Sequence, residues 1–277
     1  MNSINVAVCQ LNVVEEKETN IQKARAMIHL AAEQGARLVV LPEMFNCPYR
    51  AEAFPGYAET YPTGDTFSML SSAARQEGIY LVGGSVPERE GERVYNASFI
   101  FGPDGSLLGR HRKIHLFDVD LSGGIRVKES STLGAGEKIT LVSTEFGPLG
   151  VAICYDIRFP ELIRLMAFQG AKVIVVPAAF NMTTGPAHWD LVFRARAVDN
   201  QSFVVAASPA RDASAGYVAY GHSMMVDPWG VVVARAGAGE EVLTAALDLA
   251  GIDRIRAELP LLAHRRTDLY SLKSKGD

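Results

Sequence analysis

The sequence predicts an α+β fold of the α/β type, a four-layer αββα sandwich with two pseudo-symmetric halves. Two observations predict it. Four segments found between residues 4 and 106 recur in the same order between residues 149 and 231. The runs 38–41 and 173–176 are also apolar without interruption. Strands of that kind are buried on both faces, as in a sheet that helices cover.

The internal repeat is too long and has too few copies for a solenoid. Each half predicts a strand, a helix, a strand, a helix and then two strands around a turn. We therefore expect two similar sheets that stack face to face, and one doubly wound sheet is the alternative that the repeat disfavours. The matching segments are 4–10 with 149–155, 35–42 with 170–177, 80–85 with 203–208, and 102–106 with 227–231.

Four helices are expected, at residues 20–34, 67–76, 161–169 and 186–201. Pro186 suits the first turn of the last helix, where a missing N–H leaves no hydrogen bond unmade. Trp189, Phe193 and Ala197 follow at four-residue spacing, so they should share one buried face.

The composition fits a single domain, 1–277, with a C-terminal tail from about residue 261. A net charge of −4 gives no reason to expect nucleic acid or an anionic membrane as a partner. No apolar run approaches the ~20 residues that span a bilayer, and the first ten residues lack the features of a signal peptide. Three cysteines without metal-type spacing indicate free thiols in the cytoplasm and no metal site.

Cys154 ends an apolar strand, and a tight turn and a helix near Pro160 follow it. A thiol at that point lies where α/β sheets bind ligands. The helix N-terminus should favour a thiolate, and the next backbone N–H is free to hold an oxyanion. A buried structural cysteine is the alternative. Cys9, its counterpart in the first half, lacks the helix start and is expected to pack in the core, whereas Cys47 is expected in an exposed loop.

A nucleophilic cysteine needs a base, and none of the six histidines has a decisive sequence context. Glu43, at the end of the strand 38–41, is the stronger candidate, because desolvation should raise its pKa toward neutrality. Ala178 stands at the matching position, so the fold alone requires no carboxylate there. Lys113 should lower the thiol pKa and stabilise an oxyanion. A helix cap or surface carboxylate is the alternative for Glu43, and a solvated basic run is the alternative for Lys113.

Taken together, these segments resemble the nitrilase (carbon–nitrogen hydrolase) superfamily from about Asn5 to Leu272. Its Glu–Lys–Cys set matches Leu-Pro-Glu-Met-Phe at Glu43, His-Arg-Lys-Ile-His at Lys113 and Ile-Cys-Tyr-Asp-Ile-Arg at Cys154. The resemblance implies the αββα sandwich and a second glutamate, Glu129, that positions the lysine and the substrate. An exposed loop carboxylate is the alternative for Glu129.

Within the superfamily, the segments 180–189, 197–201, 207–212 and 220–223 most resemble the ω-amidase family. That implies hydrolysis of the terminal amide of small dicarboxylic acid monoamides, namely 2-oxoglutaramate, 2-oxosuccinamate and succinamate, through a cysteine thioester. One departure is Cys47, where the family has serine, although Tyr49 is kept. An amidase for deaminated glutathione or an N-carbamoyl hydrolase remains the alternative, followed by a nitrile hydrolase and a non-catalytic module.

The resemblance also implies which residues contact the substrate. Its residue matches make Tyr155, Arg158, Tyr49, Phe117 and Asn181 the substrate-binding residues, with the Tyr155 N–H at the oxyanion and Arg158 at the distal carboxylate. An arginine that only ties the helix start to nearby carboxylates is the alternative for Arg158. No cofactor is needed, the expected partner is a small-molecule amide, and a homodimer or a higher homo-oligomer is expected.

Overall fold

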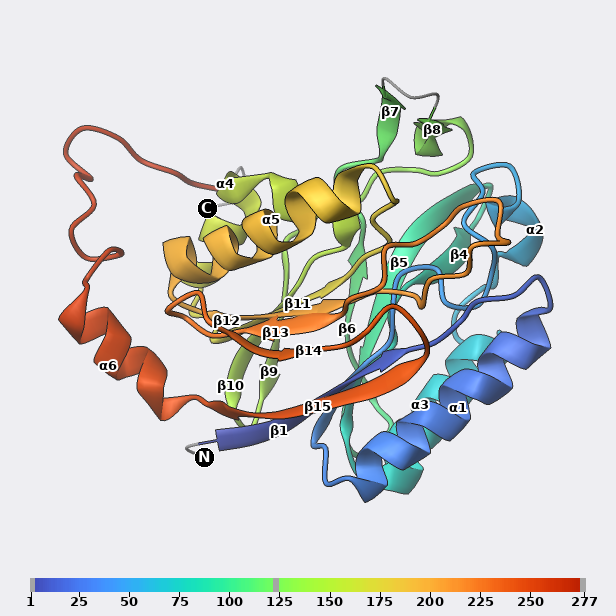
Figure 1. Ribbon diagram of the computed structural model, residues 1–277, viewed down its shortest axis with the longest axis horizontal. Helices are drawn as coiled ribbons and strands as arrows, with labels where there is room; N and C mark the ends of the chain where they lie inside the picture. Colours follow the sequence, from blue (N-terminus) through green and yellow to red (C-terminus); the bar gives the residue numbers. More distant parts are fainter. Residues whose placement is uncertain (1–2, 122–124, 275–277) are drawn as a thin grey trace.

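The computed structural model of the protein describes residues 3–121 and 125–274, and its two large sheets lie face to face (Figure 1). The first sheet has the order β15-β1-β2-β3-β5-β4, with β6 also paired to β5, and the second has the order β14-β13-β12-β11-β10-β9. The strands of the first sheet are β1 (Ser3–Gln10), β2 (Leu38–Val40), β3 (Tyr80–Val82), β4 (Val86–Glu90), β5 (Arg93–Phe101), β6 (Leu107–Arg112) and β15 (Glu241–Asp248). Those of the second are β9 (Thr140–Thr144), β10 (Gly147–Val151), β11 (Val173–Pro177), β12 (Phe203–Ala207), β13 (Met224–Val226) and β14 (Val232–Arg235).

Strand pairing corresponds in the two sheets, apart from β4, which the first sheet has in addition. The strands β1, β2 and β3 are parallel, as are β10, β11 and β12. Each set continues into two antiparallel strands, β5 and β6 in the first sheet and β13 and β14 in the second. The repeated segments therefore occupy equivalent places, which confirms the two-halves prediction and excludes one doubly wound sheet.

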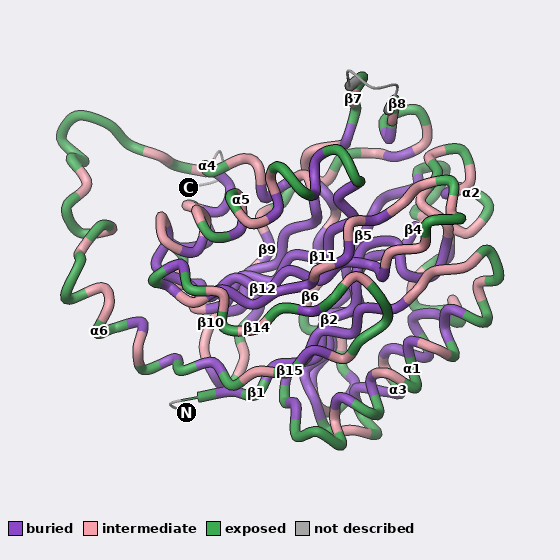
Figure 2. Tube along the Cα trace, viewed as in Figure 1, coloured by how far each residue is buried: buried purple, intermediate pink, exposed green. Residues whose placement is uncertain are grey.

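Side chains of β1 alternate between two cores, as the period of two in a strand requires. Val6 and Val8 point toward the other sheet and belong to the cluster between the sheets, which also contains Val173 and Val175 of β11. The intervening Ala7 points toward the helices on the outside. In Figure 2 the strands of both sheets are mostly buried. This alternation produces four layers from two sheets.

Helices cover the outer face of each sheet. The first sheet is covered by α1 (Lys17–Glu33) and α3 (Asp65–Glu77), and the second by α4 (Pro160–Phe168) and α5 (Thr184–Asn200). All four were predicted, each within three residues of its observed ends.

The helix α5 has Pro186 in its first turn, as predicted. Trp189, Phe193 and Ala197 are all buried on one face, against the second sheet. Asn181 accounts for the earlier start at Thr184, because its Oδ1 accepts the N–H of Thr184 at 2.9 Å. This caps a helix end that would otherwise leave backbone donors unpaired.

The segments that the sequence singled out follow strand ends. Glu43 follows β2, Lys113 follows β6 and Cys154 follows β10. In the repeat, β2 corresponds to β11, and Glu43 accepts the N–H of Ala179, which follows β11. Because β11 is paired in parallel with β10, this contact brings Glu43 and Cys154 to the same edge of the sandwich. Beyond that edge lies a small pair of strands, β7 (Asp118–Leu121) and β8 (Ile125–Lys128), which leads into a single 3₁₀ turn at Glu129–Ser131.

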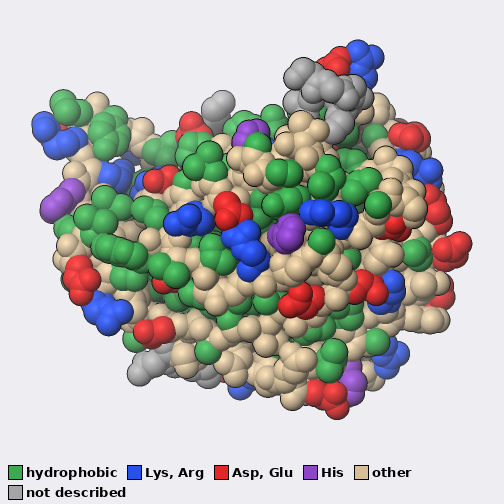
Figure 3. All heavy atoms as spheres, in the orientation of Figure 1, with side chains coloured by type: hydrophobic (Ala, Val, Ile, Leu, Met, Phe, Trp, Pro, Cys, Tyr) green, Lys and Arg blue, Asp and Glu red, His purple; other side chains and the backbone are tan. Residues whose placement is uncertain are grey.

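After β15 the chain leaves the sandwich through α6 (Ala250–Glu258) and a tail that returns toward α4 (Figure 1). The guanidinium of Arg265 lies 3.9 Å from the ring centroid of Phe168, the last residue of α4. The short helix α2 (Phe54–Tyr57) lies beside β4. No helix in the described part of the chain is long and apolar enough to cross a membrane. Acidic and basic side chains are intermixed over the face in Figure 3.

Candidate active site

Cys154 begins a 3₁₀ turn (Cys154–Arg158) after β10, and its φ of 47° lies in the left-handed region. A non-glycine residue there is strained and keeps that conformation only where its surroundings fix it. Asp156 fixes the turn, because its Oδ2 accepts the N–H of Ile153 at 3.1 Å while its own N–H donates to the Ile153 carbonyl at 3.0 Å. The turn presents the thiol at the carboxyl end of the strand.

The Cys154 residue is 4% exposed. Burial raises the pKa of Cys154 well above its usual value, Glu43 raises it further, and Lys113 lowers it. Desolvation therefore outweighs the effect of the Lys113 ammonium on the pKa of the thiol. Attack on a substrate requires a neighbouring base to take the proton.

Glu43 lies beside the thiol with both carboxylate oxygens occupied. Its Oε1 accepts hydrogen bonds from Lys113 Nζ and Asn96 Nδ2, each at 2.9 Å. Its Oε2 accepts the backbone N–H of Ala179, also at 2.9 Å. Burial raises the pKa of Glu43, Lys113 lowers it and Glu129 raises it, while a hydrogen bond with Cys154 also lowers it. The net rise agrees with the prediction and excludes a surface carboxylate.

Lys113 is fully buried, which excludes a solvated basic run. Its Nζ lies 2.9 Å from Oε1 of Glu43 and 2.9 Å from Oε1 of Glu129. Burial alone would lower the pKa of Lys113, but the carboxylates of Glu129 and Glu43 raise it well above its usual value. The ammonium is therefore a fixed positive charge beside Cys154.

Glu129 is also fully buried and is not an exposed loop carboxylate. Besides the ion pair with Lys113, it accepts the Tyr49 hydroxyl on Oε1 at 2.8 Å and the Phe117 N–H on Oε2 at 2.7 Å. These bonds hold the carboxylate against the lysine, so Glu129 and Glu43 both bind the ammonium.

Aromatic side chains predicted to bind substrate gather around this ion pair. The ring of Phe117 stands edge-on to that of Tyr155, with centroids 5.1 Å apart. Tyr155 in turn stands edge-on to Phe159 at 5.3 Å. Tyr49 bonds Glu129 through its hydroxyl, and its ring stacks at 4.5 Å on Tyr217. Aromatic rings thus surround the charged groups of the site.

Arg158 is the last residue of the 3₁₀ turn that begins at Cys154, and it is half-buried. Its Nη1 lies 3.2 Å from Nδ1 of His188, and its guanidinium lies 4.5 Å from the ring centroid of Phe180. Burial lowers its pKa. In the described part of the chain it forms no salt bridge, so it does not tie the helix start to a carboxylate there. A partly desolvated cation without an anion is suited to bind one.

Asn181 is buried, and its side-chain oxygen caps α5. Oδ1 accepts N–H groups from both Thr183 and Thr184. Its Nδ2 has no hydrogen-bond partner within the described residues. The capping role is one that the sequence analysis did not include.

Asp156 is a residue to which the sequence analysis gave no role. It is fully buried and accepts His111 Nε2 at 3.1 Å and His115 Nδ1 at 2.8 Å, in addition to the N–H groups of Ile153 and His115. Although burial opposes it, these histidine bonds hold the pKa of Asp156 well below its usual range. Asp156 therefore links the turn of Cys154 to the segment that follows Lys113.

The sequence analysis also did not predict three residues that contact Glu43 or Tyr49. Asn96 is a single amide within the apolar strand β5, a pattern that signals a buried polar role. The Ala179 N–H and Tyr217 had no sequence signal, since they reach Glu43 and Tyr49 from segments more than 130 residues away in sequence.

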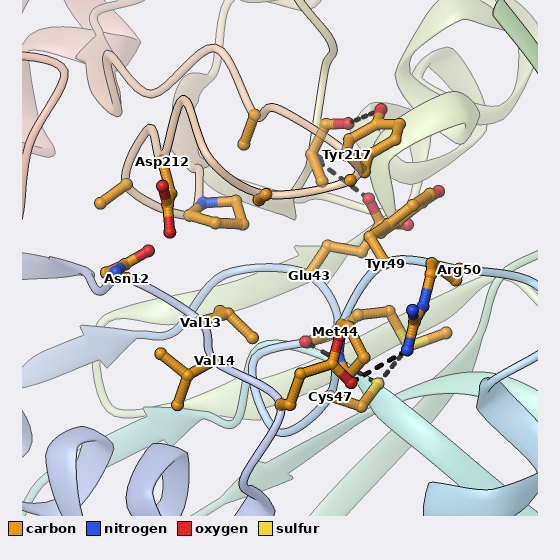
Figure 4. A pocket seen from close by; sticks show the side chains of 18 of the residues that line it. Asn12, Val13, Val14, Glu43, Met44, Cys47, Tyr49, Arg50, Asp212 and Tyr217 are labelled. Carbon is orange, nitrogen blue, oxygen red and sulfur yellow. Dashed lines mark hydrogen bonds and ion pairs between the residues drawn. The ribbon is translucent and has the colours of Figure 1, made fainter.

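A cavity of about 370 Å³ opens beside Glu43 (Figure 4). Its walls come from the loops that follow β1, β2, β11 and β12. Glu43, Tyr49, Ala179 and Tyr217 are among its lining residues, and Cys154 is not. The cavity therefore reaches the carboxylate without reaching the sulfur.

The other two cysteines differ from Cys154. Burial raises the pKa of Cys9 to about 12, and Cys9 packs between the first sheet and its helices, as expected. Cys47 is 1% exposed, so the predicted exposed loop is wrong: the segment after Glu43 folds inward onto Phe54. Across residues 3–121 and 125–274, no group of three or more His, Cys, Asp or Glu side chains is arranged to hold a metal ion.

Comparison with known proteins matches the whole chain. The sequence family described as carbon–nitrogen hydrolase matches residues 5–257. The omega-amidase NIT2 of Danio rerio is 50% identical over 274 residues, 99% of each chain. The omega-amidase NIT2 of Homo sapiens is 47% identical over 275 residues, again 99% of each chain. The crystal structure of Saccharomyces cerevisiae Nit3, a member of branch 10 of the nitrilase superfamily, is 44% identical with a TM-score of 0.88, and covers 96% of this chain and 97% of its own.

Proposed function

Because the chain belongs to the carbon–nitrogen hydrolase family, we propose that it is an amidase for small dicarboxylic acid monoamides. It would hydrolyse the terminal amide of 2-oxoglutaramate, 2-oxosuccinamate or succinamate to the acid and ammonia. The similarity to two omega-amidases over 99% of each chain supports this substrate class. As a member of the family, the chain is a hydrolase of non-peptide carbon–nitrogen bonds.

One observation carries the mechanism: the buried Glu43 carboxylate, ion-paired with Lys113 at 2.9 Å, acts electrostatically on the Cys154 thiol. A carboxylate with a raised pKa beside a neutral thiol is suited to take its proton as the sulfur attacks. Lys113 supplies a fixed positive charge near the carbonyl oxygen, where negative charge develops.

The proposed reaction has two halves. Glu43 takes the proton of Cys154, the sulfur attacks the amide carbon, and the oxyanion is held by Lys113 and the Tyr155 N–H. Glu43 then gives the proton to the leaving nitrogen, so that ammonia departs and a thioester remains. In the second half Glu43 takes a proton from water, the hydroxide attacks the thioester, and the acid leaves as Cys154 regains its proton.

Glu129 acts in this scheme through Lys113, which it holds in place with Tyr49 and Phe117. Arg158 would bind the distal carboxylate of the substrate, because it is the half-buried cation at the end of the nucleophile turn and a guanidinium binds carboxylates through two parallel hydrogen bonds. The aromatic rings of Tyr155 and Phe117 would line the acyl chain. The Nδ2 of Asn181, which has no partner among the described residues, is a donor available to it.

The test is ammonia release from 2-oxoglutaramate, succinamate, butyramide, deaminated glutathione and an N-carbamoyl amino acid. We expect turnover of the first two, lost in Cys154→Ala and kept in the matched control Cys9→Ala, which alters the corresponding cysteine of the other half. Turnover of the carbamoyl compound alone, or of deaminated glutathione alone, would retain the mechanism and replace the substrate. Absence of Cys154-dependent turnover with all of them would refute the proposal.

We also propose a homodimer or a higher homo-oligomer and a cytoplasmic location. Leu191 of α5 is 66% exposed and Leu269 of the tail is 71% exposed, so both side chains are available for an apolar contact. Light scattering after size exclusion measures the oligomer directly. The three free, buried cysteines support a reducing compartment, and fractionation of the source cells tests it.

A further inference from the structure

Tyr217 lies in the wall of the cavity, beside Glu43. Its ring lines the cavity together with Glu43 and stacks on Tyr49, whose hydroxyl is bonded to Glu129 (Figure 4). Burial raises the pKa of Tyr217 well above its usual value, and the next largest contribution comes from Cys154, which agrees with a position close to the sulfur. The stacked rings of Tyr217 and Tyr49 therefore form part of the cavity wall beside Glu43.

The side chain of Tyr217 is fixed beside Glu43 through Ala179. Its hydroxyl donates to the Ala179 carbonyl oxygen at 2.5 Å, and the Ala179 N–H donates to Glu43 Oε2 at 2.9 Å. The ring thus lies on the Oε2 side of the carboxylate, while Lys113 and Asn96 occupy Oε1. Glu43 and Tyr217 are thus joined through Ala179, and both line the cavity.

In the proposed reaction, each of the three substituents of the amide carbon faces a different residue of the site. The oxygen turns toward Lys113, and the acyl chain extends toward Arg158. The leaving nitrogen must lie against Glu43, because Glu43 protonates it. Any group carried on that nitrogen would extend past Glu43 toward the cavity, and it would meet the Tyr217 ring.

We propose that Tyr217 is a specificity-determining residue that restricts the enzyme to primary amides by blocking the space that an N-substituent would need. This inference rests on the proposed function. With the ring in place, only ammonia, which has no bulk beyond its hydrogens, leaves past Glu43. With the ring removed, the substituent would enter the cavity.

The cavity is suited to receive such a group. At about 370 Å³ it exceeds the size of a benzyl group, and its walls include Val13, Val14 and Met44, which are apolar. Gly216, the residue before Tyr217, has no atom within 4 Å of where a Cβ would lie, so the loop there is not packed against its surroundings. An apolar N-substituent would be buried favourably once the ring is gone.

The experiment compares succinamate with N-benzylsuccinamate, with succinate release as the readout and Cys154→Ala as the background. The measured quantity is the ratio of kcat/KM for the N-benzyl amide to that for the primary amide. In Tyr217→Ala we expect the ratio to rise by about tenfold or more, the scale on which pocket size discriminates between substrates. Tyr217→Phe is the matched control, since it keeps the ring and should leave the ratio within about twofold of the unaltered protein.

Tyr217→Leu provides a second variant that preserves apolar bulk, and it should give an intermediate ratio even if Tyr217→Ala does not fold. An unchanged ratio in the Ala and Leu variants, with primary amide turnover still present, would overturn the role of Tyr217 and leave the proposed function intact. A rise in Tyr217→Phe equal to that in Tyr217→Ala would also overturn it, because the hydroxyl would then be the determinant. Absence of succinamate turnover in the unaltered protein would instead refute the proposed function.

Discussion

The carboxylate of Asp156 accepts the backbone N–H of His115 at 2.9 Å, which joins the turn of Cys154 to the segment that follows Lys113. The same carboxylate accepts the N–H of Ile153 immediately before the thiol. One buried anion therefore sets the distance between the nucleophile and the lysine, although it is hydrogen-bonded to neither side chain.

Asp156→Asn should weaken both the fold and the reaction. An amide offers one acceptor oxygen where the carboxylate offers two. If the NH₂ replaces Oδ2, it faces the donors of His111 and Ile153, and if it replaces Oδ1, it faces the donor of His115. We expect a loss of about 3 kcal/mol in the free energy of unfolding, as for buried donors left unpaired. We also expect kcat to fall by about 10²-fold through misplacement of the thiol.

Urea unfolding and steady-state kinetics measure the two effects of this change. Asp118→Asn is the control, because Asp118 is exposed and accepts a single N–H from Ser130. A kcat in Asp156→Asn equal to that of the control would show that Asp156 does not position the thiol.

Glu43→Gln should separate thiol reactivity from catalysis. The anion of Glu43 raises the pKa of Cys154, so its removal lowers that pKa while Lys113 still favours the thiolate. Alkylation by iodoacetamide, which requires the thiolate, should become faster at a given pH, whereas amide turnover should fall by about 10²–10⁴-fold with the base gone.

The pH dependence of the alkylation rate independently tests the direction in which the pKa of Cys154 is shifted. A raised thiol pKa means that the thiolate forms only as the pH passes above the usual value of about 8.5. In the unaltered protein the alkylation rate should therefore still be rising at about pH 9, and the rise should begin at lower pH in Glu43→Gln. Slower alkylation in the variant at every pH would show that Glu43 promotes thiolate formation in the resting site.

Arg158→Lys should affect substrates according to their charge. If the guanidinium binds the distal carboxylate through two hydrogen bonds, lysine replaces a two-point contact with one. We expect KM for succinamate to rise by about tenfold with kcat little changed, as for loss of uniform binding, and KM for butyramide, which has no carboxylate, to stay the same.

Arg164→Lys is the matched control for Arg158→Lys. Arg164 is also half-buried, burial lowers its pKa as well, and it has no salt bridge among the described residues. Equal changes of KM for the two amides in Arg158→Lys would remove Arg158 from the carboxylate site.

Much of the fold could be predicted because its signals are local. An apolar run marks each central strand, and the spacing of Trp189 and Phe193 marks a helix face. The repeat then fixes how the two halves correspond. Glu43, Lys113 and Cys154 are recognisable for the same reason, since each follows a strand end within a few residues.

What could not be predicted depends on contacts between distant segments. The pKa of Cys154 depends on how completely the fold removes water, which neither its turn nor Lys113 reveals. Cys47 is buried because Phe54 and its neighbours cover it. Tyr217 lies in a loop of small residues, and only the approach of that loop to Tyr49 gives it a place beside the site.

Gly84 provides a test of how the fold holds Glu43. Its φ is +51°, and a Cβ there would lie 2.1 Å from the carbonyl oxygen of Pro42, the residue before Glu43. Backbone cannot yield as a flexible side chain can, so Gly84→Ala must push the 41–43 segment away. We expect a loss of about 2–4 kcal/mol in the free energy of unfolding, from left-handed strain plus overpacking.

Gly78→Ala separates those two causes. Gly78 has a φ of +63°, but no atom lies within 4 Å of where its Cβ would be, so alanine there adds left-handed strain of about 1–2 kcal/mol and no clash. Gly84→Ala should therefore be the more destabilised of the two in urea. It should also be the only one that lowers kcat, because displacement of Pro42 shifts the Glu43 carboxylate from Lys113 and the thiol. Equal stability losses with unchanged kcat in both would mean that the strand end can shift while Glu43 stays in place, held by Lys113, Asn96 and Ala179 alone.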